Sequence, residues 1–328
     1  MSTIVVPNIP TNLSLLDDET LTAGGPDLAA HPGYFRARQQ VAWERFEKLP
    51  MPARNDEAWR FANVKAIDLA PFKRAFPITD AECAALVARS TGLDETSGRM
   101  VFANDRLLAR QFHGDSLRAK GVLWLPLEQA IAEQRELIEK HFLREDAILG
   151  SRKFAALHEA QVRNGTFLHV PRGVEIALPI EAFHWLGGEN ASIFPHTLII
   201  ADEMSKVTLV DYFQSSGDDA GLACGVNDIV VGNGAKVTYV AVQQWNAKTL
   251  AFHLNNTTVA RDASALALAL NLGGQMSAVK RSATCAARAG AATCSASPPP
   301  RACRCSTSAR CKFTRRRTPR AICSTRIR

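Results

Sequence analysis

The sequence predicts an α+β fold, in which a mainly helical domain over residues 31–163 is followed by a β-helix, or solenoid, over residues 164–280. Two patterns indicate it. Apolar residues recur at helical spacing in the first region, whereas the second has short strands rich in Val, Ile, Leu and Thr between turns of Gly, Asn and Asp. The length of 328 residues and the hydrophobic content of 46% allow a sizeable core. Residues 1–30 show no periodicity, and we expect them to form a flexible N-terminal arm.

Helical spacing recurs four times in the first region. The segments with an apolar side among charged residues are 34–49, 79–90, 126–143 and 154–162. Pro50 and Pro52 end the first of these helices. In residues 101–112, Asn104 and Asp105 separate two apolar flanks, which predicts a hairpin or a bent strand.

A strand–turn–strand unit recurs at a nearly constant interval in the second region. Strands are expected to begin at Val174, Val207, Val237 and Leu266, so the intervals are 33, 30 and 29 residues. Such a repeat is typical of a solenoid, because each unit buries its inward row of side chains only when the next unit stacks on it. A β-sandwich or jelly roll also has many short strands with turns between them, and the pattern leaves that alternative open.

The net charge of +7 comes from one end of the chain. Residues 281–328 contain eleven Arg, one Lys and no acidic residue, so residues 1–280 carry 27 basic and 32 acidic side chains. This acidic balance gives no reason to expect a nucleic-acid partner. Six of the eight cysteines also lie in residues 281–328, and the two others, Cys83 and Cys224, are typical of a reducing compartment.

Neither a secretory signal nor a membrane partner is expected. The first residues have no basic region ahead of an apolar stretch. The best apolar runs, at 207–213 and 265–272, are too short to cross a bilayer. We therefore expect a cytoplasmic protein.

Residues 281–328 have a composition that cannot build a core. They contain no Leu, Val, Met, Trp or Tyr and are rich in Ala, Arg, Pro, Ser, Thr and Cys, as GC-rich codons read out of frame would be. We predict an out-of-frame, disordered tail and a β-helix that is incomplete at its C-terminal end. A zinc or cluster site at Cys303, Cys305 and Cys311 is an alternative, but repeated C-x2-C pairs are lacking. The arginines at 315–317 have no interleaved aromatic residues, so nucleic-acid binding is poorly supported.

Three stretches, in their order along the chain, resemble motifs of the SufB/SufD family. RNDEAWRFANVKAI at 54–67 is similar to a Glu-x-Trp-Arg/Lys-Tyr/Phe element of its helical region, and NGTFLHVPRGVEIALPIEAF at 164–183 to the start of its β-helix. LGGQMSAVK at 272–280 lies where the family has a Gly-Gly turn. The long helical region makes the resemblance closest to the SufD type. The matched residues, which we interpret as structural, are Glu57, Trp59, Arg60, Phe61, Gly165, Phe167, Pro171, Gly173 and Pro179.

The resemblance implies a right-handed parallel β-helix and a non-catalytic scaffold subunit of iron–sulfur cluster assembly. It implies two partners, a SufB-type scaffold subunit and a SufC-type ATPase. It also implies that the complex handles the cluster transiently, with no cofactor bound by this chain alone. In the family, a functional histidine and a C-terminal helical domain that binds the ATPase follow the matched region. No histidine follows His253 here, so that role cannot be assigned to a residue of this sequence.

No spacing in the sequence predicts a catalytic or a metal site. The solenoid histidines, which we interpret as hydrogen-bonded structural residues, are His169, His184, His196 and His253. Cys224 is interpreted as a small buried side chain. The acidic residues of this region are scattered and comprise Asp211, Asp219, Asp228 and Asp262. A β-helix carbohydrate-active enzyme, the alternative function, would need such residues on one face. A non-functional truncated scaffold is a third possibility.

Overall fold

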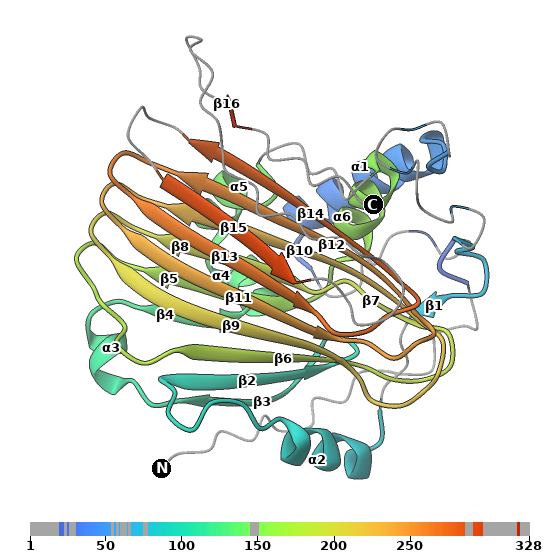
Figure 1. Ribbon diagram of the computed structural model, residues 1–328, viewed down its shortest axis with the longest axis horizontal. Helices are drawn as coiled ribbons and strands as arrows, with labels where there is room; N and C mark the ends of the chain where they lie inside the picture. The colour runs from blue at the N-terminus through green and yellow to red at the C-terminus, as the bar shows by residue number, and fades with distance from the viewer. Residues whose placement is uncertain are drawn as a thin grey trace.

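Two mainly parallel β-sheets face each other, and helices cover the outer side of one of them (Figure 1). The computed structural model describes residues 20–22, 25, 31–53, 56, 59, 64, 67–74, 78–144, 151–285, 291–297 and 320–321, and from residue 277 onward only the backbone. From β8 to β15 successive strands alternate between the two sheets, which makes a solenoid of about four coils. The predicted fold class, helices followed by a parallel solenoid, is confirmed.

The strands divide into a seven-stranded and a nine-stranded sheet. In spatial order the first contains β15 (Ala291–Ser297), β13 (Ser264–Asn271), β11 (Lys236–Gln244), β9 (Lys206–Ser215), β6 (Ile180–Leu186), β2 (Gly98–Ala103) and β3 (Arg106–Phe112). The second contains β16 (Arg320–Ala321), β14 (Met276–Cys285), β12 (Thr249–Val259), β10 (Gly221–Val231), β8 (His196–Ala201), β5 (Gly165–Val170) and β4 (Leu123–Pro126). A short strand β7 (Ala191–Ile193) pairs with β10 and with β1 (Lys73–Arg74).

Equivalent residues of successive coils lie side by side. Lys206 pairs with Lys236, which pairs with Ser264, and the alternation of each strand is kept across all three. Side chains at alternate positions therefore form rows that face the interior shared by the two sheets. This interior is mainly apolar and forms one large cluster of buried side chains.

Three of the four predicted strand starts fall within one or two residues of the observed start of a strand. Val207, Val237 and Leu266 lie at or near the beginning of β9, β11 and β13. The prediction of a strand from Val174 is wrong, because β6 begins at Ile180. Residues 174–179 contribute only a bridge between Glu175 and Lys206, and the last of them is a proline, which has no N–H to donate to a ladder.

Six helices are described, and five of them overlap the predicted segments. They are α1 (Gly33–Lys48), α2 (Asp80–Arg89), α3 (Asp115–Ala119), α4 (Leu127–Glu133), α5 (Arg135–His141) and α6 (Arg152–Gln161). The prediction of one helix over 126–143 is wrong, because the backbone leaves the helical region at Gln134, with φ −116° and ψ 44°. Both halves still bury apolar residues, Ile131 in α4 and Ile138 in α5, so the apolar spacing alone does not reveal the break.

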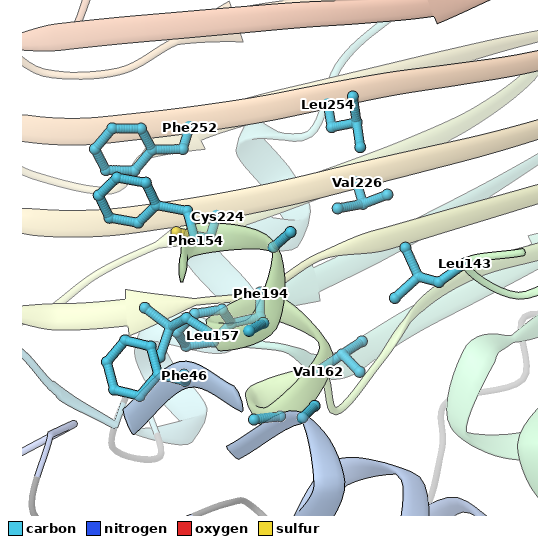
Figure 2. Close-up of a cluster of buried hydrophobic side chains, with 14 of the residues drawn as sticks. Phe46, Leu143, Phe154, Leu157, Val162, Phe194, Cys224, Val226, Phe252 and Leu254 are labelled. Atoms are coloured by element: carbon cyan, nitrogen blue, oxygen red, sulfur yellow. The ribbon is translucent and has the colours of Figure 1, made fainter. Parts of the chain in front are cut away.

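Helix α6 lies between α1 and the nine-stranded sheet and is buried along nearly its whole length. Figure 2 shows its Phe154 and Leu157 among side chains of the sheet, with Cys224 and Phe252 on neighbouring strands. The rings of Phe154 and Phe252 stack with centroids 4.1 Å apart. On the other side of α6, the carboxylate of Glu159 binds arginines of α1. The helices are thus joined to the solenoid by an apolar core and to each other by ion pairs.

Strands also occur before residue 164 and after residue 280. The predicted hairpin over 101–112 is confirmed as β2 and β3, which pair antiparallel and extend the seven-stranded sheet at β6. At the far end, β14 continues past Lys280 to Cys285, and β15 pairs with β13. The domain boundaries and the out-of-frame tail stay predictions.

Candidate functional site: a polar cluster inside the solenoid

Six polar side chains lie together inside the solenoid, although its interior is otherwise mainly apolar. Each comes from a different strand, and each is at most 4% exposed. They are His184 of β6, Thr197 of β8, Asp211 of β9, Asn227 of β10, Tyr239 of β11 and His253 of β12. We call this group the interior polar cluster.

Asp211 is at the centre of the interior polar cluster. Its Oδ2 accepts hydrogen bonds from the hydroxyls of Thr197, at 2.6 Å, and Tyr239, at 2.8 Å. Its Oδ1 lies 3.8 Å from Nε2 of His184. A buried carboxylate is costly unless it is hydrogen-bonded, and these two hydroxyl groups supply that compensation at one of its oxygens.

His184 is held in place by aromatic stacking on both sides. Its ring stacks with Phe102 at a centroid distance of 5.0 Å and with Phe213 at 4.9 Å. Its Nε2 has no hydrogen-bond partner, and the same is true of Oδ1 of Asp211 and Oδ1 of Asn227. The cluster therefore contains both satisfied and unsatisfied hydrogen-bonding groups within the described residues.

His253 completes the cluster through Asn227. Its Nε2 lies 2.7 Å from the side-chain amide nitrogen of Asn227, so this ring nitrogen accepts the hydrogen bond. Burial lowers the pKa of His253 to about 4, with the Asp211 charge acting in the opposite direction and His184 adding to the lowering. His253 is therefore neutral at neutral pH.

Burial and the nearby charge of Asp211 also raise the pKa of Tyr239 well above its ordinary value. The phenol stays protonated and remains a hydrogen-bond donor to the carboxylate. A neutral histidine and an un-ionised phenol do not provide an activated nucleophile. Among the described residues, no group of three or more His, Cys, Asp or Glu is arranged to hold a metal ion.

A second set of polar side chains lies on the outer side of the nine-stranded sheet, beneath the helices. His158 of α6 contacts His196 of β8, with 3.1 Å between their nitrogens. His196 in turn lies 3.4 Å from a carboxylate oxygen of Asp228 on β10. Of the histidines singled out from the sequence, His184 and His253 thus lie in the interior polar cluster, and His196 lies in this second set.

The remaining candidates lie elsewhere. His169 bonds to Asp202, at 2.8 Å, on a partly exposed part of the surface. Cys224 is fully buried, and burial raises the pKa of its thiol beyond the ordinary range. Asp219 and Asp262 lie outside the strands, so the four aspartates do not share one face.

The family-motif residues that the structure describes lie in packed positions or at turns. Trp59 is 2% exposed and lies against Phe154, with ring centroids 5.9 Å apart. Gly165 has φ +152°, and a Cβ there would lie 2.0 Å from the carbonyl oxygen of His196. Gly173 has φ +72° at a turn, and its N–H donates to Glu203.

The other motif residues are buried, at a turn, or not described. Phe167 is fully buried, and the carbonyls of Pro171 and Pro179 accept hydrogen bonds from Val174 and Ser97. Glu57, Arg60 and Phe61 lie outside the described residues. The interpretation of the family-motif residues as structural therefore stays a prediction.

Sequence reasoning missed four participants in the two polar sets: Thr197, Asn227, Tyr239 and His158. A signal for one of them, Tyr239, was available in the strand alternation. Tyr239 is two residues after Val237 and Asp211 is four after Val207, so both share the inward face of their strands. Counting polar residues on the inward face would have selected them.

Comparison with known families gives two matches that follow each other along the chain. The family described as "SufBD protein N-terminal region" matches residues 30–182. The family described as "SUF system FeS cluster assembly, SufBD core domain" matches residues 184–296. The second match covers the interior polar cluster, and the first covers the described helices.

Curated proteins give the same result. The chain is 28% identical over 217 residues to "Iron-sulfur cluster assembly protein SufD" of Bacillus subtilis (strain 168), covering 64% of this chain and 48% of that protein. It is 33% identical over 135 residues to an iron–sulfur cluster assembly SufBD family protein of Staphylococcus aureus (strain USA300), covering 39% of this chain and 28% of the relative. The chain thus spans about half the length of the first relative and less of the second.

In its described part, no helix is both long and apolar enough to cross a membrane.

Proposed function

Because the chain belongs to the SufB/SufD family of iron–sulfur cluster assembly proteins, we propose that it is a non-catalytic scaffold subunit of a Suf complex. Its partners would be a SufB-type scaffold subunit and a SufC-type ATPase. The observation that carries the proposal is the presence of both family regions in consecutive order, folded as helices joined to a parallel solenoid.

The interior of the solenoid supports a structural role for its polar side chains and not a catalytic one. The interior polar cluster is at most 4% exposed, and its Tyr239 and His253 are un-ionised at neutral pH because of burial. A buried group of this kind fixes the stacking of coils more readily than it meets a substrate. The iron–sulfur cluster that the complex assembles would be transient cargo, and this chain alone would hold no cofactor.

Co-purification tests the partners. The full chain, carrying an affinity tag, would be co-expressed with a SufB-type subunit and a SufC-type ATPase. We expect all three to elute together in size-exclusion chromatography at the size of a complex, and we expect the chain alone to show no ATPase activity. Elution of the tagged, folded chain apart from both partners would contradict the proposal.

We also propose that the protein acts in the cytoplasm. The support is the presence of only two cysteines before residue 281, since a secreted protein of this size would often use disulfides. Cell fractionation with an antibody against the chain would test it, and recovery with the periplasmic or the membrane fraction would contradict it.

The composition of residues 281–328 supports a separate proposal, that this segment is translated out of frame. Sequencing the DNA around codons 270–290 and translating all three frames tests it. Another frame that continues with Val-, Leu- and Gly-rich coils would support the proposal. A confirmed reading frame with no such continuation would reject it.

A further inference from the structure

Four polar residues form a continuous line between helix α6 and the nine-stranded sheet. They are His158 of α6, His196 of β8, Asp228 of β10 and Asn256 of β12. Each is at most 6% exposed, and the line crosses three neighbouring strands. It lies on the opposite side of the sheet from the interior polar cluster, and the proposed scaffold function does not depend on it.

A backbone carbonyl shows which ring nitrogen of His158, the first residue of this line, carries a hydrogen. Nδ1 of His158 lies 2.7 Å from the carbonyl oxygen of Cys224, and a carbonyl oxygen can only accept, so Nδ1 carries a hydrogen. Burial, together with the neighbouring His196, lowers the pKa of His158 well below its ordinary value. His158 is therefore neutral, and its second nitrogen, Nε2, presents a lone pair.

The lone pair on Nε2 of His158 determines which nitrogen of His196 carries a hydrogen. Nε2 of His158 lies 3.1 Å from Nδ1 of His196, so Nδ1 of His196 must donate. The other nitrogen of His196, Nε2, then faces Oδ2 of Asp228 at 3.4 Å. The direction of each hydrogen bond thus follows from the one before it, starting at the carbonyl of Cys224.

Asp228 is a buried carboxylate that already accepts two hydrogen bonds. Its Oδ2 accepts from the backbone N–H of Leu143, at 2.7 Å, and its Oδ1 from the side-chain amide of Asn256, at 3.1 Å. If His196 were neutral while Asp228 kept its charge, the Nε2 lone pair would face this carboxylate, and two acceptors would lie against each other out of water.

We propose that His196 is held as an imidazolium, paired with the Asp228 carboxylate, and that this pair locks the helices onto the solenoid. The pair connects α6, through His158, to β8 and β10. It also connects residue Leu143, which follows α5 and has a positive φ of 45°, to the same strands. Phe142 covers the ring of His196, with centroids 4.2 Å apart, and shields the pair from solvent.

The groups facing His196 come from every element packed around it. The charged or titratable ones are His158 of α6 and Asp228 of β10, whereas Asn256 of β12 and the ring of Phe142 are uncharged. A buried pair of opposite charges needs both partners, because loss of either leaves the other uncompensated. Docking of the helices is therefore conditional on the proton of His196.

Nitrogen NMR of the full chain, labelled with ¹⁵N-histidine, tests the protonation directly at neutral pH. The His196 signals would be assigned by their absence from the H196Q spectrum. We expect both ring nitrogens of His196 to carry hydrogens, and His158 to show one protonated and one lone-pair nitrogen. A lone-pair nitrogen in His196 would overturn the proposal, since the proton would then belong to Asp228.

A variant separates the charge pair from simple packing. D228N keeps the shape of the side chain but removes the charge, so His196 should lose its second proton and show a lone-pair nitrogen. Hydrogen exchange at Leu143 and along α6 should become at least tenfold faster. H169Q is the control, because His169 also contacts an aspartate, Asp202, but lies on a partly exposed part of the surface and outside the line of buried polar residues. A His196 that stays doubly protonated in D228N would contradict the proposed pairing.

Discussion

The hydroxyl of Tyr239 shows what a single residue contributes to the solenoid interior. It is fully buried and donates a 2.8 Å hydrogen bond to the carboxylate of Asp211. Hydrogen bonds to charged groups contribute more than neutral ones, because the buried charge would otherwise be poorly solvated.

Tyr239→Phe should lower the free energy of unfolding by roughly 2 kcal/mol, since Asp211 loses one of its two hydroxyl donors. Urea denaturation would measure it. Tyr212→Phe is the matched control, because Tyr212 also donates to a carboxylate, that of Glu181 at 3.2 Å, but is only partly buried. An equal loss in both variants would contradict the special role of the interior.

The lowered pKa of His253 predicts how the free energy of unfolding depends on pH. Its pKa is about 4 in the folded chain, below the ordinary 6.5, so the unfolded chain binds its proton more readily. Stability is therefore complete above about pH 6.5 and falls as the pH drops toward 4, by roughly 3 kcal/mol from this residue. Urea denaturation between pH 4 and 8 would measure the slope, and His253→Asn should reduce it. An unchanged slope in that variant would show that His253 is not the cause.

Two glycines distinguish backbone strain from a steric clash. At Gly165 a Cβ would lie 2.0 Å from the carbonyl oxygen of His196, whereas at Gly173 it would meet no atom within 4 Å. Gly165→Ala should therefore prevent stable folding or cost more than about 3 kcal/mol, and Gly173→Ala should cost about 1–2 kcal/mol for its positive φ. Thermal unfolding of both variants would check the order, and a similar loss in the two would contradict it.

At the scale of the elements, how much the sequence predicts depends on whether the signal is local. The start of α2 follows from its capping box, in which Thr79 and Glu82 bond to each other's backbone N–H groups. The break at Gln134 has no such signal, because the buried residues on both sides keep helical spacing. The start of β6 was misplaced for a related reason: the apolar run from Val174 precedes a proline, and pairing begins after it.

Thr79→Ala should lower the stability of α2 by about 1 kcal/mol, because the N–H of Glu82 loses its side-chain acceptor. Hydrogen exchange of the first turn of α2 would report it, and exchange in α6, whose cap is Ser151, serves as the internal control. Faster exchange spread over both helices would mean that the effect is global and not a capping effect.

At the scale of the whole molecule, the nearly constant strand interval favoured a solenoid, while a β-sandwich stayed open, but the assembly of the interior polar cluster was not predictable. Its members lie on six strands, and only the register of the sheets brings them together. The same holds for the line from His158 to Asn256, whose ends are 98 residues apart in the sequence. Periodicity predicts which elements stack; it does not state which polar side chains meet.

Shared cores predict cooperative unfolding. The nine-stranded sheet contributes side chains to the helix-facing core and to the interior. Buried tryptophans report on both regions, Trp43 and Trp59 on the first and Trp124 and Trp245 on the second. Tryptophan fluorescence and far-UV circular dichroism should therefore give the same midpoint in urea. Two separate transitions would show that the helices detach before the solenoid unfolds.

The register of the coils has a consequence for how such a chain can change in length. Since Lys206 pairs with Lys236 and Val207 with Val237, joining Lys206 directly to Val237 would remove one coil and keep the inward and outward positions of the later strands unchanged. An insertion or deletion of one entire coil leaves inward residues inward, whereas a change of one residue, or of any odd number, within a strand turns them outward. Lineages of this fold should therefore lengthen or shorten by duplication or loss of complete coils, with shorter changes confined to the turns.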